Sequence, residues 1–314
     1  MRTLPAGLCV VTGLLLLTSC AQKETAAGPT DVPTCDAELS SRPGTASEPA
    51  DEETDGVSIT DQGSDGARDC AAFQITNRAG EPLTYTVTFA FLSDSGSRMG
   101  DTDRTVPSVA AGRTVTGTVG GGEPLLGAQG WSRVRVEKVR SVPADEAPAP
   151  GGPCPSSGLR LYADEGDAAM GLRVVGLHAV NCGHRTQRLT GYPRVSPLGE
   201  DHRPVTGLRI LHDGSGIATG TGADGPARPV SLKPGEAAHA GLVWRNTVLS
   251  GAAVDVPYVR VWAKPGAAPV MVTPELDLGT TGKLAVGPWK RDTQADRDHG
   301  SQPGVTEGRP PADR

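Results

Sequence analysis

Hydrophobic and polar residues alternate along much of the chain with a period of two residues. One group of alternating segments is 71–77, 83–92, 113–119 and 132–139. A second group is 159–162, 171–180, 207–212, 239–244, 257–263 and 269–273. Such alternation, punctuated by glycine and proline, is typical of half-buried strands in β-sandwiches. Because no segment carries a sustained helical pattern, the sequence predicts an all-β protein, in the form of two tandem Ig-like β-sandwiches.

Composition separates the segments that can bury a core from those that cannot. The predicted parts are a signal peptide (1–19), a tether that begins at the lipidated N-terminus (20–56), a first sandwich (57–142), a proline-rich linker (143–153), a second sandwich (154–289) and a tail (290–314). The tether and the tail are polar, so they cannot offset the entropy cost of ordering and are expected to be disordered. The linker, PADEAPAPGGP, is expected to be semi-stiff because of its prolines.

A faint internal repeat favours two copies of one plan. The stretch VPSVAAGRTVTGTV (106–119) resembles PVSLKPGEAAHAGLVW (229–244), with a turn at Gly112 or Gly235 between two strands. Upstream, Asn77 and Asn181 each end a strand. The second copy carries an additional glycine-rich stretch, HDGSGIATGTGADG (212–225). Its G-x-G-x-x-G is followed by prolines and strands rather than by a helix, so we interpret it as a flexible surface loop and not as a dinucleotide site.

The N-terminus has the features of an export signal. Arg2 precedes an apolar run at 8–17, which is shorter than the roughly 20 residues that a spanning helix needs. The sequence Leu17-Thr18-Ser19-Cys20 resembles the lipobox of bacterial lipoproteins. This resemblance implies that Cys20 receives a diacylglycerol and becomes the mature N-terminus. The expected location is the extracytoplasmic face of the cell membrane, to which the N-terminal lipid attaches the protein.

The remaining cysteines are expected to form disulfides. Besides Cys20 and the cysteine removed with the signal, the chain contains Cys35, Cys70, Cys154 and Cys182. Exported proteins meet an oxidising environment, so an even set of cysteines indicates disulfides. Four cysteines allow three pairings. The pairs Cys35–Cys70 and Cys154–Cys182 are favoured, because each pair then lies on one side of the linker.

Charge and motifs narrow the classes of function. The net charge of −6 does not indicate nucleic-acid binding, which usually requires a basic patch. The chain lacks C-x-x-C, G-x-S-x-G and H-E-x-x-H motifs, so no catalytic residue, metal site or cofactor is predicted and we do not expect an enzyme. His178 and His239 lie within predicted strands, where a structural role is favoured.

One strand offers a candidate binding surface. In YVRVWA (258–263), Tyr258, Arg260 and Trp262 share one face, opposite the two valines. This face can bind a sugar or a protein through aromatic stacking and cation–π contacts. The alternative, which we favour, is that both aromatic rings fill the core while Arg260 reaches solvent.

The segment VNCGHRTQRLTGYPRV (180–195) carries a more specific signal. Together with Cys154 and the Pro234-Gly235 turn, its Asn181, Cys182 and Gly191-Tyr192-Pro193 resemble the actinobacterial lipoprotein domain of unknown function family 4232. The resemblance covers residues 154–289 and implies an Ig-like sandwich on a surface lipoprotein, with no established activity. One departure is that Cys182 directly follows Asn181, whereas the family's second cysteine usually lies nearer the Gly-Tyr-Pro turn.

These features favour a non-enzymatic binding, accessory or sensor module of the cell envelope. Its expected partner is an envelope protein or a wall polymer. The alternatives are a structural or adhesion spacer and, less favoured, a secreted hydrolase.

Overall fold

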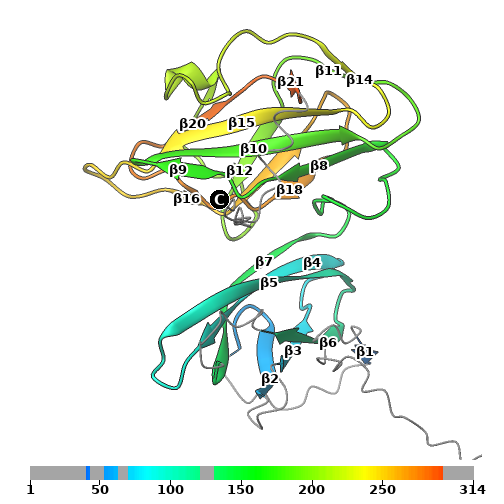
Figure 1. The fold of residues 1–314 in the computed structure, drawn as a ribbon, viewed down its shortest axis with the longest axis vertical. Coiled ribbons are helices and arrows are strands. Elements are labelled where there is room, and N and C mark those ends of the chain that lie inside the picture. Colours follow the sequence, from blue (N-terminus) through cyan, green and yellow to red (C-terminus); the bar gives the residue numbers. More distant parts are fainter. Residues whose placement is uncertain (1–39, 43–52, 63–69, 121–130, 293–314) are drawn as a thin grey trace, which may run out of the picture. The chain divides into compact units, whose positions relative to one another are not determined.

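The computed structural model describes residues 40–42, 53–62, 70–120 and 131–292 (Figure 1). The signal peptide, Cys20, Cys35 and the residues after 292 lie outside these ranges. The described residues belong to one compact unit. They are nearly all β, with a single short 3₁₀ helix at Gly214–Gly216, which confirms the predicted all-β class.

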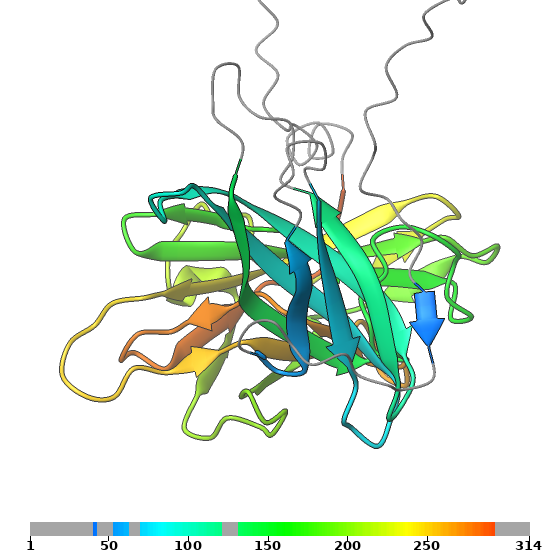
Figure 2. The ribbon, with the colours of Figure 1, turned by 90° about the horizontal axis from the view of Figure 1, so that it is seen from below.

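The first sandwich is formed by two antiparallel sheets (Figures 1 and 2). One sheet has the order β1 (Ser40–Arg42), β6 (Thr114–Gly120), β3 (Cys70–Thr76) and β2 (Val57–Gln62). The other has the order β5 (Arg98–Val109), β4 (Leu83–Leu92) and β7 (Arg133–Pro143). Alternate residues of both sheets meet in a single core, in which the rings of Phe73 and Phe89 lie 4.9 Å apart.

The second sandwich is larger. Its main sheet has the order β13 (Arg209–His212), β20 (Lys283–Val286), β15 (Ala237–Arg245), β10 (Leu172–Asn181) and β8 (Leu159–Ala163), with β9 (Asp167–Ala169) on β10 and β21 (Lys290–Arg291) on β15. The other strands are β12 (Arg194–Leu198), β17 (Tyr258–Trp262) and β18 (Val270–Val272) in one sheet, and the pairs β11 (Gln187–Leu189) with β14 (Val230–Leu232) and β16 (Asp255–Val256) with β19 (Leu276–Asp277). Leu177, Leu242, Val259, Val261 and Trp289 are buried in their common core.

A buried asparagine has the same hydrogen bonds in each sandwich. Asn77 and Asn181 are both completely buried. Each donates from its side chain to the carbonyl four residues later and to a carbonyl on a distant strand, and accepts from the N–H two residues later. The partners are Glu81, Val109 and Ala79 for Asn77, and Arg185, Leu232 and Gly183 for Asn181. The two sandwiches therefore share the arrangement that the sequence repeat indicates.

The turns that follow are also equivalent. The N–H of Gly112 donates to the carbonyl of Asn77, and the N–H of Gly235 donates to that of Asn181. The asparagines are 104 positions apart and the glycines 123, so the second sandwich has 19 more residues between these points. The glycine-rich stretch lies within this longer connection.

The glycine-rich stretch packs on the main sheet instead of forming the loose loop that we expected from its composition. Ala223 is 1% exposed, and a Cβ at Gly214, Gly241 or Gly287 would come within 2.8 Å of it. Lys290 on β21 donates to a carbonyl of the stretch at 2.7 Å. The glycines therefore allow close contact with the sheet, which composition alone does not distinguish from flexibility.

The disulfide Cys154–Cys182 is present, with a Cα–Cα distance of 5.6 Å, and confirms the predicted pair. Cys70 is also disulfide-bonded. Its pairing with Cys35 stays a prediction.

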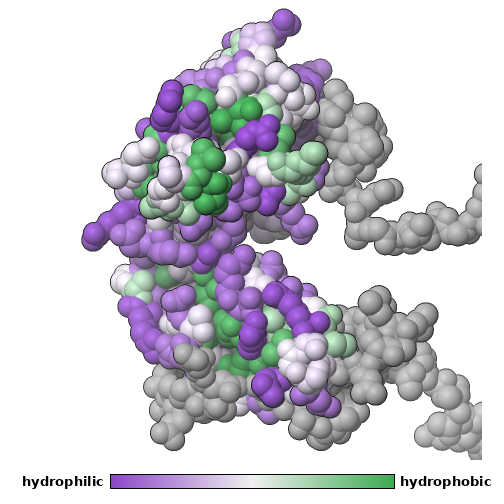
Figure 3. All heavy atoms as spheres, turned by 90° about the vertical axis from the view of Figure 1, so that its left-hand side faces the viewer, coloured by the Kyte–Doolittle hydropathy of each residue, from purple (hydrophilic) through white to green (hydrophobic). Residues whose placement is uncertain are grey.

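Few large hydrophobic residues are exposed in the described part of the chain. They are Met99, Met170, Ile210, Val248 and Leu249. Figure 3 shows a group of hydrophobic residues surrounded by hydrophilic ones on the second sandwich.

Candidate functional site

The outer face of the β5-β4-β7 sheet forms a trough with charged walls. The central strand contributes Thr88 to the floor. In one cross-strand row, Asp103 of β5 and Lys138 of β7 flank Thr88. In the next row, Asp101 and Arg135 flank Ala90. The β5 wall therefore carries Asp101 and Asp103 together with Arg98, and the β7 wall carries Lys138 together with Glu137.

A β-bulge shapes the wall that β7 forms. Thr88 pairs with Lys138 but its neighbour Phe89 pairs with Val136, so Glu137 is an additional residue on β7. A bulge turns side chains that would otherwise alternate toward the same side of a sheet. Glu137 and Lys138 accordingly both line the trough.

The trough contains an open cavity of about 710 Å³. Its lining residues are Thr88, Arg98, Asp101, Asp103, Glu137, Lys138 and, from the connection between β8 and β9, Glu165. None of these side chains is hydrophobic, so the cavity suits a polar or charged ligand and not an apolar one.

The charges of the trough are only partly neutralised within the protein. Arg98 bonds Asp101 at 2.7 Å and reaches Glu137 at 3.5 Å, and its pKa is raised chiefly by the hydrogen bond to Asp101. Asp103 accepts a hydrogen bond from the Thr88 hydroxyl at 2.6 Å. Adjacent strands are roughly 4.8 Å apart, so Asp103 and Lys138 face each other across about 10 Å. A ligand with both a positive and a negative group can bridge that span.

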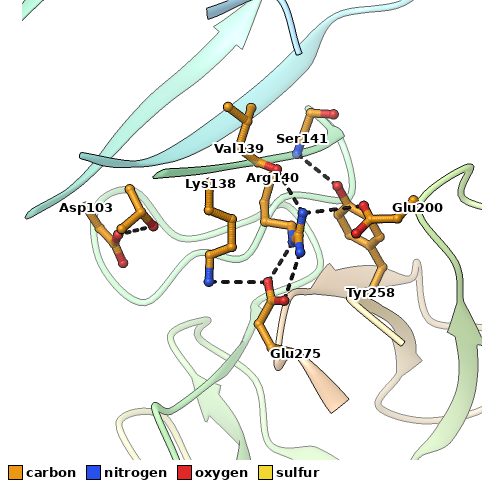
Figure 4. Close-up of polar contacts among 9 residues, drawn as sticks. Asp103, Lys138, Val139, Arg140, Ser141, Glu200, Tyr258 and Glu275 are labelled. Carbon is orange, nitrogen blue, oxygen red and sulfur yellow. Dashed lines mark hydrogen bonds and ion pairs between the residues drawn. The ribbon is translucent and has the colours of Figure 1, made fainter. Parts of the chain in front are cut away.

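One end of the trough meets a charged junction with the second sandwich (Figure 4). Arg140 of β7 makes two bonds to Glu275, at 2.6 and 2.8 Å, and lies 3.4 Å from Glu200. The hydrogen bond to Glu275 is the main reason that the pKa of Arg140 is raised. Lys138 lies 3.5 Å from the same carboxylate. Glu275 thus contacts both a trough residue and the guanidinium that joins the two sandwiches.

Tyr258, one of the residues in the candidate aromatic surface, lies inside this junction. It is 3% exposed and packs with Val142, Leu198 and Met271. The Ser141 N–H donates to its hydroxyl at 3.3 Å. Tyr258 is therefore not available to an external ligand, which agrees with the favoured interpretation that this ring is buried.

The other two residues of that face also have partners within the chain. Arg260 bonds Glu146 of the proline-rich linker at 2.6 Å. The carbonyl of Glu146 accepts the Met271 N–H at 2.7 Å. The half-buried Trp262 lies beneath the guanidinium of Arg194, 3.7 Å from its ring centre. Alternation placed these side chains on the correct face, but the linker occupies part of it.

A second polar cluster lies on the outer face of the main sheet of the second sandwich. His178 and His239 are directly paired across β10 and β15. His178 bonds Asp164 at 2.9 Å, and His239 bonds Asp292 at 2.5 Å, while Tyr162 stacks on the His178 ring. The hydrogen bond to Asp164, and after it the interaction with the Asp292 carboxylate 4.0 Å away, raise the pKa of His178 to about 9. Burial alone would raise the pKa of Asp292, but its interactions with both histidines lower it.

This cluster predicts a loss of stability at alkaline pH. The pKa of His178 is higher in the folded protein than its unfolded value of about 6.5, so its stabilisation is complete below that pH and is lost as the pH rises to about 9. We expect the free energy of unfolding to fall by about 1–3 kcal/mol across this window, since solvent reaches Asp164 and weakens the pair. Urea unfolding at pH 6 and pH 9 measures it.

The fall should be smaller in His178→Gln than in the parent chain. His184→Gln is the matched control, because His184 is exposed and belongs to neither contact. An equal fall in the free energy of unfolding in His178→Gln and in the parent would show that His178 does not cause the pH dependence.

Among the described residues, no three His, Cys, Asp or Glu side chains are grouped so as to hold a metal ion. None of their helices has the length and hydropathy to cross a membrane.

Residues 154–290 match the family model described as Domain of unknown function (DUF4232). The match confirms the resemblance that Cys154, Asn181, Cys182 and the Gly-Tyr-Pro turn indicate. It covers the second sandwich, whereas the trough is formed mainly by the first. Comparison of the chain with curated proteins and with solved structures gives no match.

Proposed function

We propose that the protein is a non-enzymatic binding module, anchored by lipid at Cys20 on the extracytoplasmic face of the membrane, and that the trough on the β5-β4-β7 sheet binds its ligand. The observation that carries the proposal is the open cavity lined by charged residues of both signs, in which Asp103 of β5 and Lys138 of β7 face each other across Thr88. The lipid anchor holds this cavity close to the cell wall.

The ligand class follows from the charges. Asp103 offers a carboxylate to an ammonium group, and Lys138 offers an ammonium group to a carboxylate, across about 10 Å. The peptide portion of a wall polymer has free amino and carboxyl groups at such spacings. We therefore propose a zwitterionic wall peptide as the ligand.

Binding is favoured over a purely structural spacer by the form of the trough. The small floor residue Thr88 and the bulge at Glu137 create a concave surface on a sheet that would otherwise be flat. Binding is favoured over hydrolysis because two of the carboxylates already accept hydrogen bonds from neighbouring side chains. Arg98 pairs with Asp101, and Thr88 donates to Asp103, as expected of groups that orient a ligand.

The test is a titration with soluble wall fragments that carry one free amine and one free carboxylate. We expect Asp103→Asn and Lys138→Gln each to weaken binding about 10-fold or more, because each removes a charge-assisted hydrogen bond. Isothermal calorimetry gives the affinity, and NMR shifts locate the site.

Arg113→Gln is the matched control, since Arg113 is exposed and lies outside the trough. Unchanged affinity in both trough variants, or no binding of any fragment at millimolar concentration, would refute the proposed site.

A further inference from the structure

Three aliphatic side chains are strongly exposed on two connections of the second sandwich. Met170 is 93% exposed in the turn between β9 and β10, and Val248 and Leu249 are 69% and 76% exposed in the connection after β15. Burial of such residues is favourable, so a cluster of them on a surface marks a contact site.

The two connections lie side by side. The Asn246 N–H donates to the carbonyl of Gly171 at 3.0 Å, which joins the start of one connection to the end of the other. The Leu249 N–H donates to the Thr280 hydroxyl at 2.9 Å. The three aliphatic side chains are therefore presented together at one end of the main sheet. Figure 1 shows β9 and β16 at this end, and Figure 3, which views the molecule from that side, shows hydrophobic residues on the second sandwich.

A row of cations lies directly beside them. Trp244 pairs with Leu284, so the next residues along the antiparallel strands, Arg245 and Lys283, are neighbours. Lys283 is in turn paired with Arg209 of β13. All three cations are exposed, and none has an ion pair among the described residues.

The carboxylates at this end of the sandwich neutralise the positive charge of the row only in part. Asp277 of β19 accepts the Gly279 N–H at 3.1 Å and so is already engaged. Asp255, paired with it on β16, is exposed. Both belong to the β16–β19 pair, whereas the three cations lie on strands of the main sheet.

We propose that this end of the second sandwich docks on the surface of an anionic lipid bilayer. Aliphatic tips beside a basic row have the chemistry of an interfacial membrane contact, in which the tips enter the boundary of headgroups and acyl chains and the cations meet anionic headgroups. A protein partner fits less well. Three aliphatic residues cover far less than the roughly 800 Å² per partner of a stable interface, and the aromatic residues that dominate such contacts are missing from the tips.

The test uses the mature chain, residues 20–314, with Cys20→Ser, so that neither an acyl chain nor the apolar signal contributes. Sedimentation with vesicles of equimolar phosphatidylglycerol and phosphatidylcholine should remove the protein from solution, and vesicles of pure phosphatidylcholine should bind it about 10-fold or more weakly. The triple variant Met170→Ser, Val248→Ser, Leu249→Ser should lose binding. Arg209→Gln with Lys283→Gln should weaken binding and reduce its salt dependence.

Met99→Ser is the matched control, because Met99 is an exposed apolar residue of the first sandwich. Thermal unfolding checks that each variant is folded. The proposal is overturned if the Cys20→Ser chain does not bind anionic vesicles, or if the triple variant binds them as well as the parent. A concentration-dependent dimer that the triple variant abolishes, without vesicle binding, would assign the surface to a second copy of the chain.

Discussion

Replacement of Asn181 by leucine is expected to lower the free energy of unfolding by about 3–5 kcal/mol. The side chain is completely buried, donates to the carbonyls of Arg185 and Leu232, and accepts the Gly183 N–H. Leucine fills a similar volume but leaves all three backbone groups without a partner. Each such group costs about 1–3 kcal/mol when buried.

Asn77→Leu should cost a similar amount, since Asn77 makes the equivalent three hydrogen bonds in the first sandwich. Urea unfolding at neutral pH measures both. Thr186→Leu is the control, because Thr186 is exposed in the same turn as Asn181 and should change stability by less than about 0.5 kcal/mol. If Asn181→Leu costs no more than this control, the asparagine does not hold the turn.

The asparagines also illustrate what the sequence can and cannot predict. The all-β class was predictable because alternation is a local property of each segment. The strand end at Asn181 was visible for the same reason. Its bond to Leu232 was not, because that residue lies 51 positions away and meets Asn181 only when distant strands have come together.

The trough shows the same limit. Small residues at alternate positions of 83–92 are visible in the sequence, and one of them gives the floor at Thr88. The bulge at Glu137 depends on the pairing of β7 with β4, so it cannot be predicted from the local sequence pattern. In the same way, the prolines of the linker (143–153) indicate a spacer. In the structure, however, Glu146 of the linker contacts both Arg260 and Met271.

Replacement of Cys20 by alanine is expected to move the protein from the membrane to the soluble fraction. The lipobox resemblance makes Cys20 the acceptor of the acyl chains, and each buried CH₂ contributes about 0.8 kcal/mol to membrane attachment. Loss of the thiol removes all of this attachment at once. Cys9→Ala is the matched control: Cys9 precedes the predicted cleavage site, so its replacement should leave the distribution unchanged.

The salt concentration of the wash separates lipid anchoring from the proposed docking of the second sandwich. Contacts of Arg209, Arg245 and Lys283 with anionic headgroups are screened at high salt, whereas buried acyl chains are not. After a high-salt wash, the parent chain should remain in the membrane pellet and the Cys20→Ala chain should leave it. At low salt, part of the Cys20→Ala chain should stay bound until Met170, Val248 and Leu249 are also replaced by serine. A Cys20→Ala chain that resists the high-salt wash would show that the lipid at Cys20 is not the anchor.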